Sequence, residues 1–399
     1  MKVLLIDVNC MKGSTGKITY DLHSVITENG HEASICYGRG DKIVESNIFK
    51  FGIDIETYVH AFLTRLTGLT GMFSPLSTYR LIKYMKKFNP DIVHIHELHA
   101  YFVNIAPVMK HLKKNNIKTI WTFHCEFMYT GKCGYAYDCN KWKTECGKCP
   151  QVKEYPASWF FDFTERMFRW KKKLFSGYTN LTIVTPSKWL GNRTKESFLE
   201  DVKLEVINNG IDTTVFYPRE TSLLRKKHEL NDERVVLAVA PNIMEERKGG
   251  KWVLELAKRF KDQNVKFILV GVEETNESFD DNIIALSRTN NQDELAGYYS
   301  MADIFVICSK KENFPTTCIE ALCCGTPVVG FDEGGTKETA PGKFGKFVRY
   351  GDVDSLTEVI HSKLNNIVNM PSSEECTEFG KKNYDKYVMC NNYIELYKK

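Results

Sequence analysis

The sequence lacks the long apolar stretch that a membrane-spanning helix requires. None of its apolar runs reaches the roughly eighteen residues needed to cross a bilayer. The opening residues, "MKVLLIDVNC", pass directly into a predicted strand and carry no small-residue cleavage site of the kind that ends a signal peptide. These absences argue against a membrane-spanning or secreted protein, and we expect the chain to be cytoplasmic.

A strong excess of one charge is also missing. The formal net charge is +4 at pH 7, which is too small to indicate binding to nucleic acid, and no segment is of low complexity. With 399 residues, of which 43% are hydrophobic and 26% charged, the composition is that of an ordinary globular protein. A chain of this length predicts two domains, each large enough for a hydrophobic core of its own.

Cysteine, in contrast, is plentiful. Thirteen cysteines without a secretory signal indicate a reducing compartment, in which thiols and metal ligands are commoner than disulfides. The closing C-x2-C of the segment "CGYAYDCNKWKTECGKCP" is a good half of a zinc site, whereas the C-x5-C before it is looser than usual. A structural zinc site, two disulfides or free thiols all remain open for the cysteines of this segment, which are Cys133, Cys139, Cys146 and Cys149.

The rest of the sequence alternates short apolar strands with helical segments. One series of strands runs from "KVLLIDV" to "NLTIVTP", and a second runs from "RVVLAVAP" to "GKFVRY". Such alternation predicts parallel sheets with helices on both faces. The segment between them, "LEVINNGIDTTVFYPRE", is rich in turn residues and indicates a linker. We therefore predict an α/β protein with two Rossmann-like, doubly wound domains, residues 1–205 and 215–375, that face a central cleft.

The turn after the first strand, "GSTGK", looks like part of a nucleotide triphosphate loop. Met11 stands where a P-loop has its first glycine, however, and Ile18 stands where it has its magnesium-binding hydroxyl. The dinucleotide fingerprint fails too, because a third glycine is missing. What remains is a small-residue turn and a helix that begins near Thr15. Both a plain turn and a backbone that approaches an anion or a sugar fit this pattern at Gly13, Ser14, Thr15 and Gly16.

The most informative stretch is residues 303–338, "DIFVICSKKENFPTTCIEALCCGTPVVGFDEGGTKE". It predicts a strand, a loop and a helix that begins near Pro315 and ends at Gly325. The N-terminus of this helix offers amide groups and positive potential to an anion such as a pyrophosphate. Glu312 precedes the helix and Glu320 lies about two turns further along. Because a carboxylate can accept from two adjacent hydroxyls of a ribose or hexose, the stretch suggests a site for a sugar nucleotide.

The spacing of these two glutamates matches the E-x7-E signature of retaining glycosyltransferases with the GT-B fold. The chain resembles glycosyltransferase family four, and the resemblance covers nearly the whole chain through "GSTGK", "TPSKWL", "VINNGIDTTVF", "ERKGG" and "NQDELAGYYSMAD". It is most similar to the bacterial branch that builds exopolysaccharide, capsule or lipopolysaccharide. The resemblance also implies that a helix at about residues 380–399 packs back on the first domain.

The resemblance implies a role for several residues. The catalytic residues would be His124, Glu312 and Lys248, with Glu312 on the donor sugar, Lys248 on the diphosphate and Glu320 on the nucleotide ribose. Relatives often carry an arginine five or six residues before this lysine; this chain does not, and Arg247 is the candidate replacement. The complete set of expected donor-binding residues is Gly13, Ser14, Thr15, Gly16, Arg247, Lys248, Asn313, Phe314, Pro315, Thr316 and Glu320.

The implied reaction moves a hexosyl unit from a nucleoside diphosphate sugar to a hydroxyl of a glycan or lipid-linked glycan, with retention of anomeric configuration. No cofactor is expected in catalysis, since no Asp-x-Asp metal clamp occurs in the right context and Asp354 of "GDVDSL" is interpreted as a helix N-cap. Two alternatives remain open: a sugar-nucleotide epimerase on the same scaffold, and a catalytically silent subunit that binds a sugar nucleotide.

Two further segments carry side chains of functional interest. In "HIHELH", ordinary strand-end histidines fit His94, His96 and His99 better than a metal site does. The segment of residues 157–177, "ASWFFDFTERMFRWKKKLFSG", mixes aromatic and basic residues. It fits either peripheral contact with an anionic inner membrane that carries a lipid-linked acceptor, or an amphipathic helix that packs on its own domain.

Overall fold

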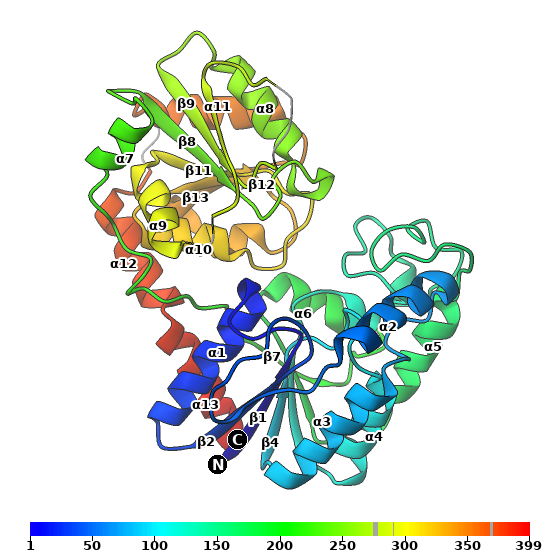
Figure 1. The fold of residues 1–399 in the computed structure, drawn as a ribbon. Helices are drawn as coiled ribbons and strands as arrows, with labels where there is room; N and C mark the ends of the chain where they lie inside the picture. Colours follow the sequence, from blue (N-terminus) through cyan, green and yellow to red (C-terminus); the bar gives the residue numbers. More distant parts are fainter. Residues whose placement is uncertain (274–277, 290, 368–369) are drawn as a thin grey trace. The chain divides into compact units, whose positions relative to one another are not determined.

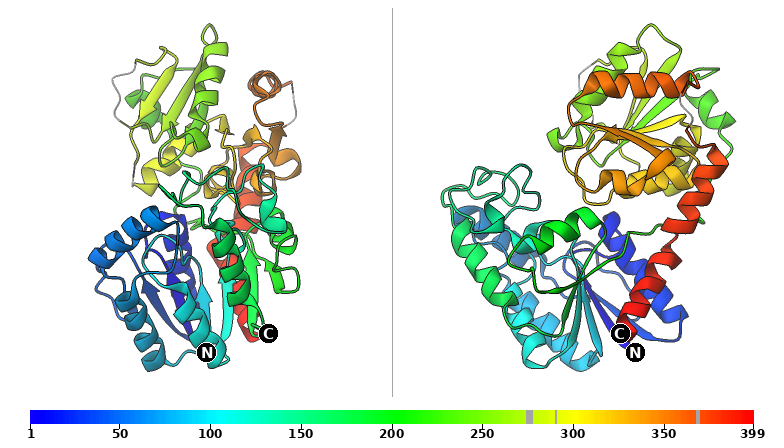
Figure 2. Two further views of the ribbon diagram at one scale, coloured as in Figure 1. Left: turned by 90° about the vertical axis from the view of Figure 1, so that its right-hand side faces the viewer. Right: turned by 180° about the vertical axis from the view of Figure 1, so that it is seen from behind.

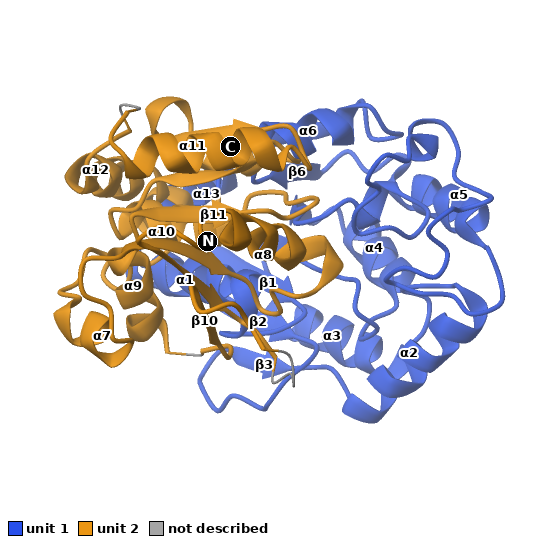
Figure 3. Cartoon of the chain, turned by 90° about the horizontal axis from the view of Figure 1, so that it is seen from above, with its two compact units in different colours: residues 1–208, 390–399 blue, residues 209–389 orange. Residues whose placement is uncertain are grey.

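The computed structural model describes residues 1–273, 278–289, 291–367 and 370–399. It divides the chain into two compact units: unit 1 comprises residues 1–208 and 390–399, and unit 2 comprises residues 209–389 (Figures 1 and 3). Each unit is a parallel sheet with helices on its faces (Figure 2). The predicted fold class, two Rossmann-like doubly wound domains, is therefore confirmed.

In the described residues, the sheet of unit 1 has seven strands in the order β3-β2-β1-β4-β5-β6-β7, and all neighbours pair in parallel. Their connections cross over on opposite sides of β1, so the point where the strand order reverses lies between β1 and β4. In doubly wound sheets, ligands bind at the carboxyl ends of the strands at such a point. The strands are β1 (Lys2–Asp7), β2 (Glu32–Tyr37), β3 (Ile48–Lys50), β4 (Ile92–Ile95), β5 (Lys118–Thr122), β6 (Leu181–Thr185) and β7 (Lys203–Val206).

The helices of unit 1 bury apolar side chains against this sheet, and the resulting core includes residues of β1, β4, β5, α3 and α4. The helices are α1 (Gly13–Glu28), α2 (Asp54–Thr67), α3 (Pro75–Phe88), α4 (Ile105–Lys114), α5 (Thr164–Phe175) and α6 (Lys188–Lys195).

Unit 2 repeats the arrangement with a six-stranded parallel sheet in the order β10-β9-β8-β11-β12-β13 among its described residues. Its order reverses between β8 and β11. The strands are β8 (Arg234–Val239), β9 (Val265–Val270), β10 (Ile283–Leu286), β11 (Ile304–Ile307), β12 (Val328–Phe331) and β13 (Gly345–Val348). The helices are α7 (Ser222–Lys227), α8 (Gly250–Arg259), α9 (Gln292–Met301), α10 (Thr316–Cys323), α11 (Val353–Leu364) and α12 (Ser373–Tyr384).

The last helix, α13 (Lys386–Lys398), ends in unit 1, and both termini of the chain lie at the same end of that unit (Figures 1 and 2). The hydroxyl of Tyr397 lies 2.6 Å from Nδ1 of His94, and the hydroxyl of Tyr393 lies 2.9 Å from Oγ1 of Thr122. Lys118 donates to the carbonyl of Tyr397 at 2.7 Å. These contacts join the C-terminal residues to β4 and β5.

Three local expectations differ from the structure. Helix α1 begins at Gly13, two residues before the expected start at Thr15, because the backbone turns at Met11 and Gly13 with positive φ. Asp352 is the N-cap of α11, since its carboxylate accepts from the amide of Ser355 at 3.0 Å, and Asp354 lies inside the first turn. Strands β3 and β7, at the two edges of the sheet, were not anticipated by the apolar pattern.

Helix α5 packs on its own unit, which is one of the two interpretations of the aromatic and basic segment. Its apolar side chains Met167, Phe168 and Phe175 are buried. Lys171, one of the basic residues of this segment, is buried as well and donates to the carbonyls of Phe127 and Thr130. In the part of the chain that the structure describes, no helix has both the length and the apolar character needed to cross a membrane.

We predict that buried His60 makes unit 1 sensitive to acid. Nε2 of His60 accepts from the amide of Gly71 at 3.2 Å, and Nδ1 lies 2.8 Å from Oγ of Ser74. Burial lowers the pKa of His60 to about 3, so the unfolded chain takes up this proton near pH 6.5 while the folded chain does not. Between pH 7 and pH 5 the free energy of unfolding should fall by about 2 kcal/mol more in the wild type than in His60→Gln.

Denaturant titrations at both pH values would measure this difference. His361→Gln, which changes an exposed histidine of α11, is the control and should leave the pH dependence of wild type unchanged. Equal pH dependence in wild type and His60→Gln would contradict the assignment of a neutral, hydrogen-bonded imidazole.

Candidate functional site

The main concentration of expected site residues lies in unit 2, at the carboxyl ends of β8 and β11. The segment after β8 carries Arg247 and Lys248, and the segment after β11 carries Glu312. Because the strand order reverses between these two strands, their carboxyl ends diverge into separate loops that can accommodate a ligand. The sequence and the topology therefore indicate the same place.

A tight turn presents Lys248. A short 3-10 helix, Glu246–Lys248, ends at Gly249, whose φ is 76°. A Cβ atom at Gly249 would lie 2.1 Å from the carbonyl oxygen of Cys308, so this position excludes every other residue type. The amide of Lys310 also donates to the carbonyl of Arg247 at 2.8 Å. The two loops are thus joined by close backbone contacts.

Glu312 is the centre of the site. Its Oε1 accepts from Nζ of Lys248 at 2.7 Å and from Nη1 of Arg247 at 3.3 Å. Its carbonyl oxygen accepts from the amide of Gly335 at 2.9 Å, and a Cβ at Gly334, where φ is 65°, would lie 1.9 Å from that oxygen. The carboxylate is therefore held by two cations on one side, and its backbone is fixed by a glycine turn on the other.

The charges of Lys248 and Arg247 determine the protonation state of Glu312. Burial opposes ionisation of Glu312, but the charges of Lys248 and Arg247 outweigh it and hold the pKa of this carboxyl below its ordinary value. Glu312 is thus an anion at neutral pH. A second carboxylate, that of Glu245, lies 3.4 Å from Nε of Arg247, so the two cations face two carboxylates before a ligand binds. Ionisable side chains whose pKa values are shifted by burial and by specific charged partners are candidates for functional sites.

Helix α10 begins directly after this loop. Pro315 occupies its N-cap position, with φ −65° and ψ 121°, and provides no side-chain cap. The helix therefore begins at Thr316, one residue after the expected start near Pro315. Asn313 and Phe314 are buried, and the carbonyl of Phe314 accepts from the side chain of Asn209 at 3.2 Å. Gly325, with φ 89°, follows the C-cap Cys324, in agreement with the expected helix end.

Glu320 lies in the second turn of α10 and has a different partner. Its Oε2 accepts from the hydroxyl of Tyr299 at 2.9 Å. Tyr299 is fully buried in α9, so its hydroxyl is a rigid donor that fixes the carboxylate. Sequence analysis did not identify Tyr299, because a tyrosine at a helical core position carries no distinguishing signal. Glu312 and Glu320 belong to the same unit but are held by separate contacts.

The remaining expected residues lie in unit 1. The turn Gly13, Ser14, Thr15 and Gly16 forms the first turn of α1, and its first residues are exposed. Gly13 has φ 71°, and a Cβ at Gly16 would lie 3.2 Å from the carbonyl oxygen of Asn9. The turn therefore keeps its backbone accessible at the carboxyl end of β1, beside the point where the strand order of unit 1 reverses.

His124 follows β5 and belongs to a row of histidine rings. Its Nε2 lies 3.1 Å from Nδ1 of His96, and the two rings are stacked. His94 lies beside His96 with ring centroids 4.2 Å apart and has hydrogen-bond partners at both nitrogens, Tyr397 and Thr122. Burial, together with the nearby His99, lowers the pKa of His124 to about 4, so its imidazole is neutral at physiological pH.

The four expected zinc ligands lie around one small cavity of unit 1. Cys133, Cys139, Cys146 and Cys149 all line it, and every cysteine of the chain is a free thiol, so neither of the two disulfides is present. A hydrogen bond between the thiols of Cys133 and Cys149 lowers the pKa of Cys149 to about 6. Among the described residues, no three of these sulfur atoms lie within 4.8 Å of one another.

Comparisons with known proteins agree with this architecture. The profile of Glycosyltransferase Family 4 matches residues 15–215, just over half of the chain, and the profile of the glycosyl transferases group 1 matches residues 220–385. The colanic acid biosynthesis glycosyl transferase WcaC of Escherichia coli strain K12 is 24% identical over 415 residues, which cover 100% of this chain and 99% of that protein.

Two solved structures share the fold. Sucrose-phosphate synthase from Thermosynechococcus elongatus has a TM-score of 0.74 at 17% identity, with 100% of this chain and 98% of that chain covered. The Anabaena protein HepE in complex with UDP-glucose has a TM-score of 0.69 at 13% identity, with 99% of each chain covered. At these identities the likeness shows the fold alone.

Two doubly wound units, one of which holds a buried carboxylate between two cations at its switch point, define a protein of the GT-B class. The chain belongs to Glycosyltransferase Family 4. It is a glycosyltransferase, an enzyme that transfers a sugar.

We predict that the ion pair of Lys248 and Glu312 stabilises unit 2 before any ligand binds. Lys248→Met should lower the free energy of unfolding of unit 2 by about 3 kcal/mol, because it leaves Glu312 buried with less compensating charge. Lys258→Met, which changes an exposed lysine of α8, should alter it by less than about 0.5 kcal/mol.

Chemical denaturation of Lys248→Met, Glu312→Gln and the double variant forms a thermodynamic cycle. We expect the double variant to be destabilised less than the sum of the single variants, since both charges are then removed together. Additive losses would mean that the two side chains do not interact.

Proposed function

We propose that the chain is a retaining, metal-independent hexosyltransferase that uses a nucleoside diphosphate sugar as donor. The observation that carries this proposal is the cluster of Arg247, Lys248 and Glu312 at the switch point of unit 2. Its two cations suit the diphosphate, whose negative charge grows as it leaves the sugar. The complex of HepE with UDP-glucose, a protein of the same fold, supports this class of donor.

In this proposal, different residues of unit 2 bind different parts of the donor. Lys248 and Arg247 neutralise the diphosphate, and the amides at the start of α10, whose N-cap residue Pro315 has no side-chain cap, add to that charge. Glu320, fixed by Tyr299, accepts hydroxyl groups of the nucleotide ribose. Glu312 and the backbone of residues 313–316 bind hydroxyls of the donor sugar.

In unit 1 we assign His124 to the donor sugar and the turn at residues 13–16 to the phosphates or the acceptor. The imidazole of His124 is neutral, so one of its ring nitrogens can accept a hydrogen bond from a sugar hydroxyl. A protonated imidazole could only donate. In the transfer, the anomeric carbon loses its bond to the diphosphate oxygen and gains one to the acceptor oxygen. The acceptor proton passes to the departing diphosphate, so no side chain needs to form a covalent bond.

The acceptor we propose is a glycan, or a glycan linked to lipid, of a bacterial surface polysaccharide. The relation to the colanic acid biosynthesis glycosyl transferase of Escherichia coli supports the polysaccharide. A lipid link is supported by an apolar surface of unit 1, which we call the aromatic patch. It consists of Ile55, Tyr58, Val59, Phe62, Trp159, Phe160 and Phe161, all exposed.

The aromatic patch joins α2 to the segment before α5. Its α2 members follow helical spacing on the outward side, and Tyr58 is 74% exposed and Phe160 70%. The amide of Trp159 donates to the carbonyl of Arg65 at 2.7 Å, and the rings of Trp159 and Phe62 lie 6.1 Å apart. Arg65 and Arg166, both exposed, add positive charge beside it. Exposed aromatic side chains with basic neighbours suit the surface of an anionic membrane.

We also propose that the four cysteines of residues 133–149 bind a structural zinc ion. Their position around one cavity and the contact between the thiols of Cys133 and Cys149 support this. The sulfur atoms must approach one another before they reach tetrahedral geometry.

We predict that three substitutions in unit 2 separate binding from transfer. Glu320→Ala and Lys248→Ala should each weaken binding of the donor by about tenfold or more, since each removes a charged hydrogen-bonding group. Glu312→Ala should lower kcat/KM by about a hundredfold with a smaller effect on binding. Glu358→Ala, which changes an exposed residue of α11, is the matched control.

Thermal-shift assays against UDP-, GDP- and ADP-sugars would identify the donor, and released nucleoside diphosphate would then be measured with and without acceptor. Release that depends on acceptor supports the transferase. Sugar interconversion without acceptor would instead identify an epimerase, and binding without either reaction a silent subunit. Unchanged turnover in all three variants would refute the assigned site.

We predict that the aromatic patch carries membrane binding. The double variant Phe62→Ser and Phe160→Ser should bind vesicles of phosphatidylglycerol and phosphatidylethanolamine about tenfold or more weakly than wild type, because each phenyl group contributes about 1.5 kcal/mol or more when it leaves water. Leu223→Ser, which changes an 83% exposed residue of α7, should bind as wild type does. Vesicle sedimentation measures both. Equal binding by wild type and the double variant would contradict the proposal.

A further inference from the structure

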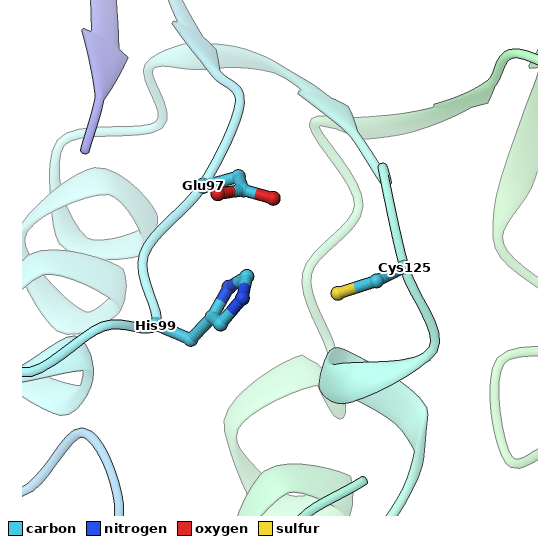
Figure 4. A group of neighbouring side chains, drawn as sticks. All are labelled: Glu97, His99 and Cys125. Carbon is cyan, nitrogen blue, oxygen red and sulfur yellow. The ribbon is translucent and has the colours of Figure 1, made fainter. Parts of the chain in front are cut away.

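A second group of potential ligands lies in unit 1, in the loops that follow β4 and β5. Glu97 and His99 follow β4, and Cys125 follows β5. The two strands are parallel neighbours, with Ile95 opposite Trp121, so the residues just beyond their carboxyl ends come together. Figure 4 shows the three side chains pointing toward one another from the two loops.

The three side chains are close enough to share one ion. A carboxylate oxygen of Glu97, a ring nitrogen of His99 and Sγ of Cys125 all lie within 4.8 Å of one another. In a tetrahedral zinc site, with bonds of about 2.0–2.3 Å, ligand atoms lie about 3.3–3.8 Å apart, so small side-chain rotations suffice. Each of the three residues is partly exposed, which leaves an entry path for an ion from solvent.

Two of these groups lack the partners that polar side chains usually have. In residues 1–273, 278–289, 291–367 and 370–399, no hydrogen bond or ion pair reaches the carboxylate of Glu97 or the ring nitrogens of His99. His94, by contrast, is paired at both nitrogens. The ring of His99 is instead held in place by stacking on Phe127, with centroids 5.1 Å apart. Partly buried bases that converge without partners favour a missing ligand.

A cysteine beside a histidine and a carboxylate could also be a nucleophile with its base. A nucleophile and its base are joined by a hydrogen bond. Among the described residues no hydrogen bond joins the ring of His99 to the thiol of Cys125, and the ring stacks on Phe127 instead. The arrangement favours a ligand set over a nucleophile.

We propose that Glu97, His99 and Cys125 bind a zinc ion in unit 1. Sulfur, imidazole nitrogen and carboxylate oxygen are together the donor set of zinc, whereas magnesium and calcium take oxygen ligands and avoid sulfur. A bound thiolate and a carboxylate supply two negative charges and balance the two positive charges of the ion. Three protein ligands leave a fourth position for water or another group, as in open zinc sites.

The proposed ion would join two loops whose other residues belong to the sugar-transfer proposal. Cys125 directly follows His124, and His124 is hydrogen-bonded to His96, the residue before Glu97. Binding would therefore fix the ends of β4 and β5 around His124. Arg247, Lys248 and Glu312, to which the diphosphate is assigned, are not among the proposed ligands of the ion. The zinc proposal stands independently of the donor, the acceptor and the reaction.

The experiment is a metal titration of the full chain after chelator treatment under reducing conditions. Cobalt(II) serves as the spectroscopic probe, because a cobalt–thiolate bond gives charge-transfer absorption, and zinc content after equilibrium dialysis gives the stoichiometry. Two zinc equivalents are expected in wild type if both proposed sites form. Cys125→Ser and His99→Gln should each lose one equivalent, and the difference spectrum should show one thiolate bond removed by Cys125→Ser.

Two controls assign the metal to its site. Cys149→Ser alters the four-cysteine segment and should keep the equivalent bound by Glu97, His99 and Cys125. Glu358→Gln repeats the chemical change of Glu97→Gln at an exposed position and should bind metal as wild type does. Circular dichroism of each variant without metal checks the fold. Glu97→Gln changes the shape of the side chain least, so its metal content decides the test if another variant unfolds. Absence of metal in wild type, or full metal content in Cys125→Ser and Glu97→Gln, would overturn the proposal.

Discussion

The buried carboxylate of Glu312 is the constraint on which the site of unit 2 depends. A carboxylate at this depth needs cations, and Lys248 and Arg247 supply them across two loops that follow different strands. Those cations can reach it only because Gly249 lets the backbone of one loop contact that of the other, and Gly334 lets a third segment contact the backbone of Glu312 itself. The site is therefore organised before a donor arrives, and a donor diphosphate would meet charges that are already in place.

Topology explains why both units concentrate reactive side chains at the same edge of their sheets. In each sheet the strand order reverses next to the first strand, and the loops diverge there. Unit 2 uses this point for cations and a carboxylate. Unit 1 uses the corresponding point for a glycine turn, a row of neutral histidines and the group of Glu97, His99 and Cys125. The same architecture thus provides two chemically different surfaces.

Sequence reasoning predicted most of the fold, because buried parallel strands are continuous apolar runs that are easily recognised. Strand β7, "KLEV", escaped it because half of its residues are polar, and β3 because it has only three residues. The glutamate spacing and Lys248 indicated the site, but the partners Tyr299, Tyr393 and Tyr397 could not be predicted, since their contacts join segments far apart in the chain. The burial of Lys171 could not be predicted for the same reason: the carbonyls that pair with it come from another segment.

The central claim is that the pair of Lys248 and Glu312 receives the diphosphate of a sugar nucleotide. The most direct measurement is a crystal structure of the chain with the nucleoside diphosphate that gives the largest thermal shift. The account predicts a phosphate oxygen within salt-bridge distance of Nζ of Lys248 and the ribose hydroxyls on Glu320. A diphosphate bound elsewhere, with the ion pair of Lys248 and Glu312 unchanged and Glu320 facing no ribose, would contradict it.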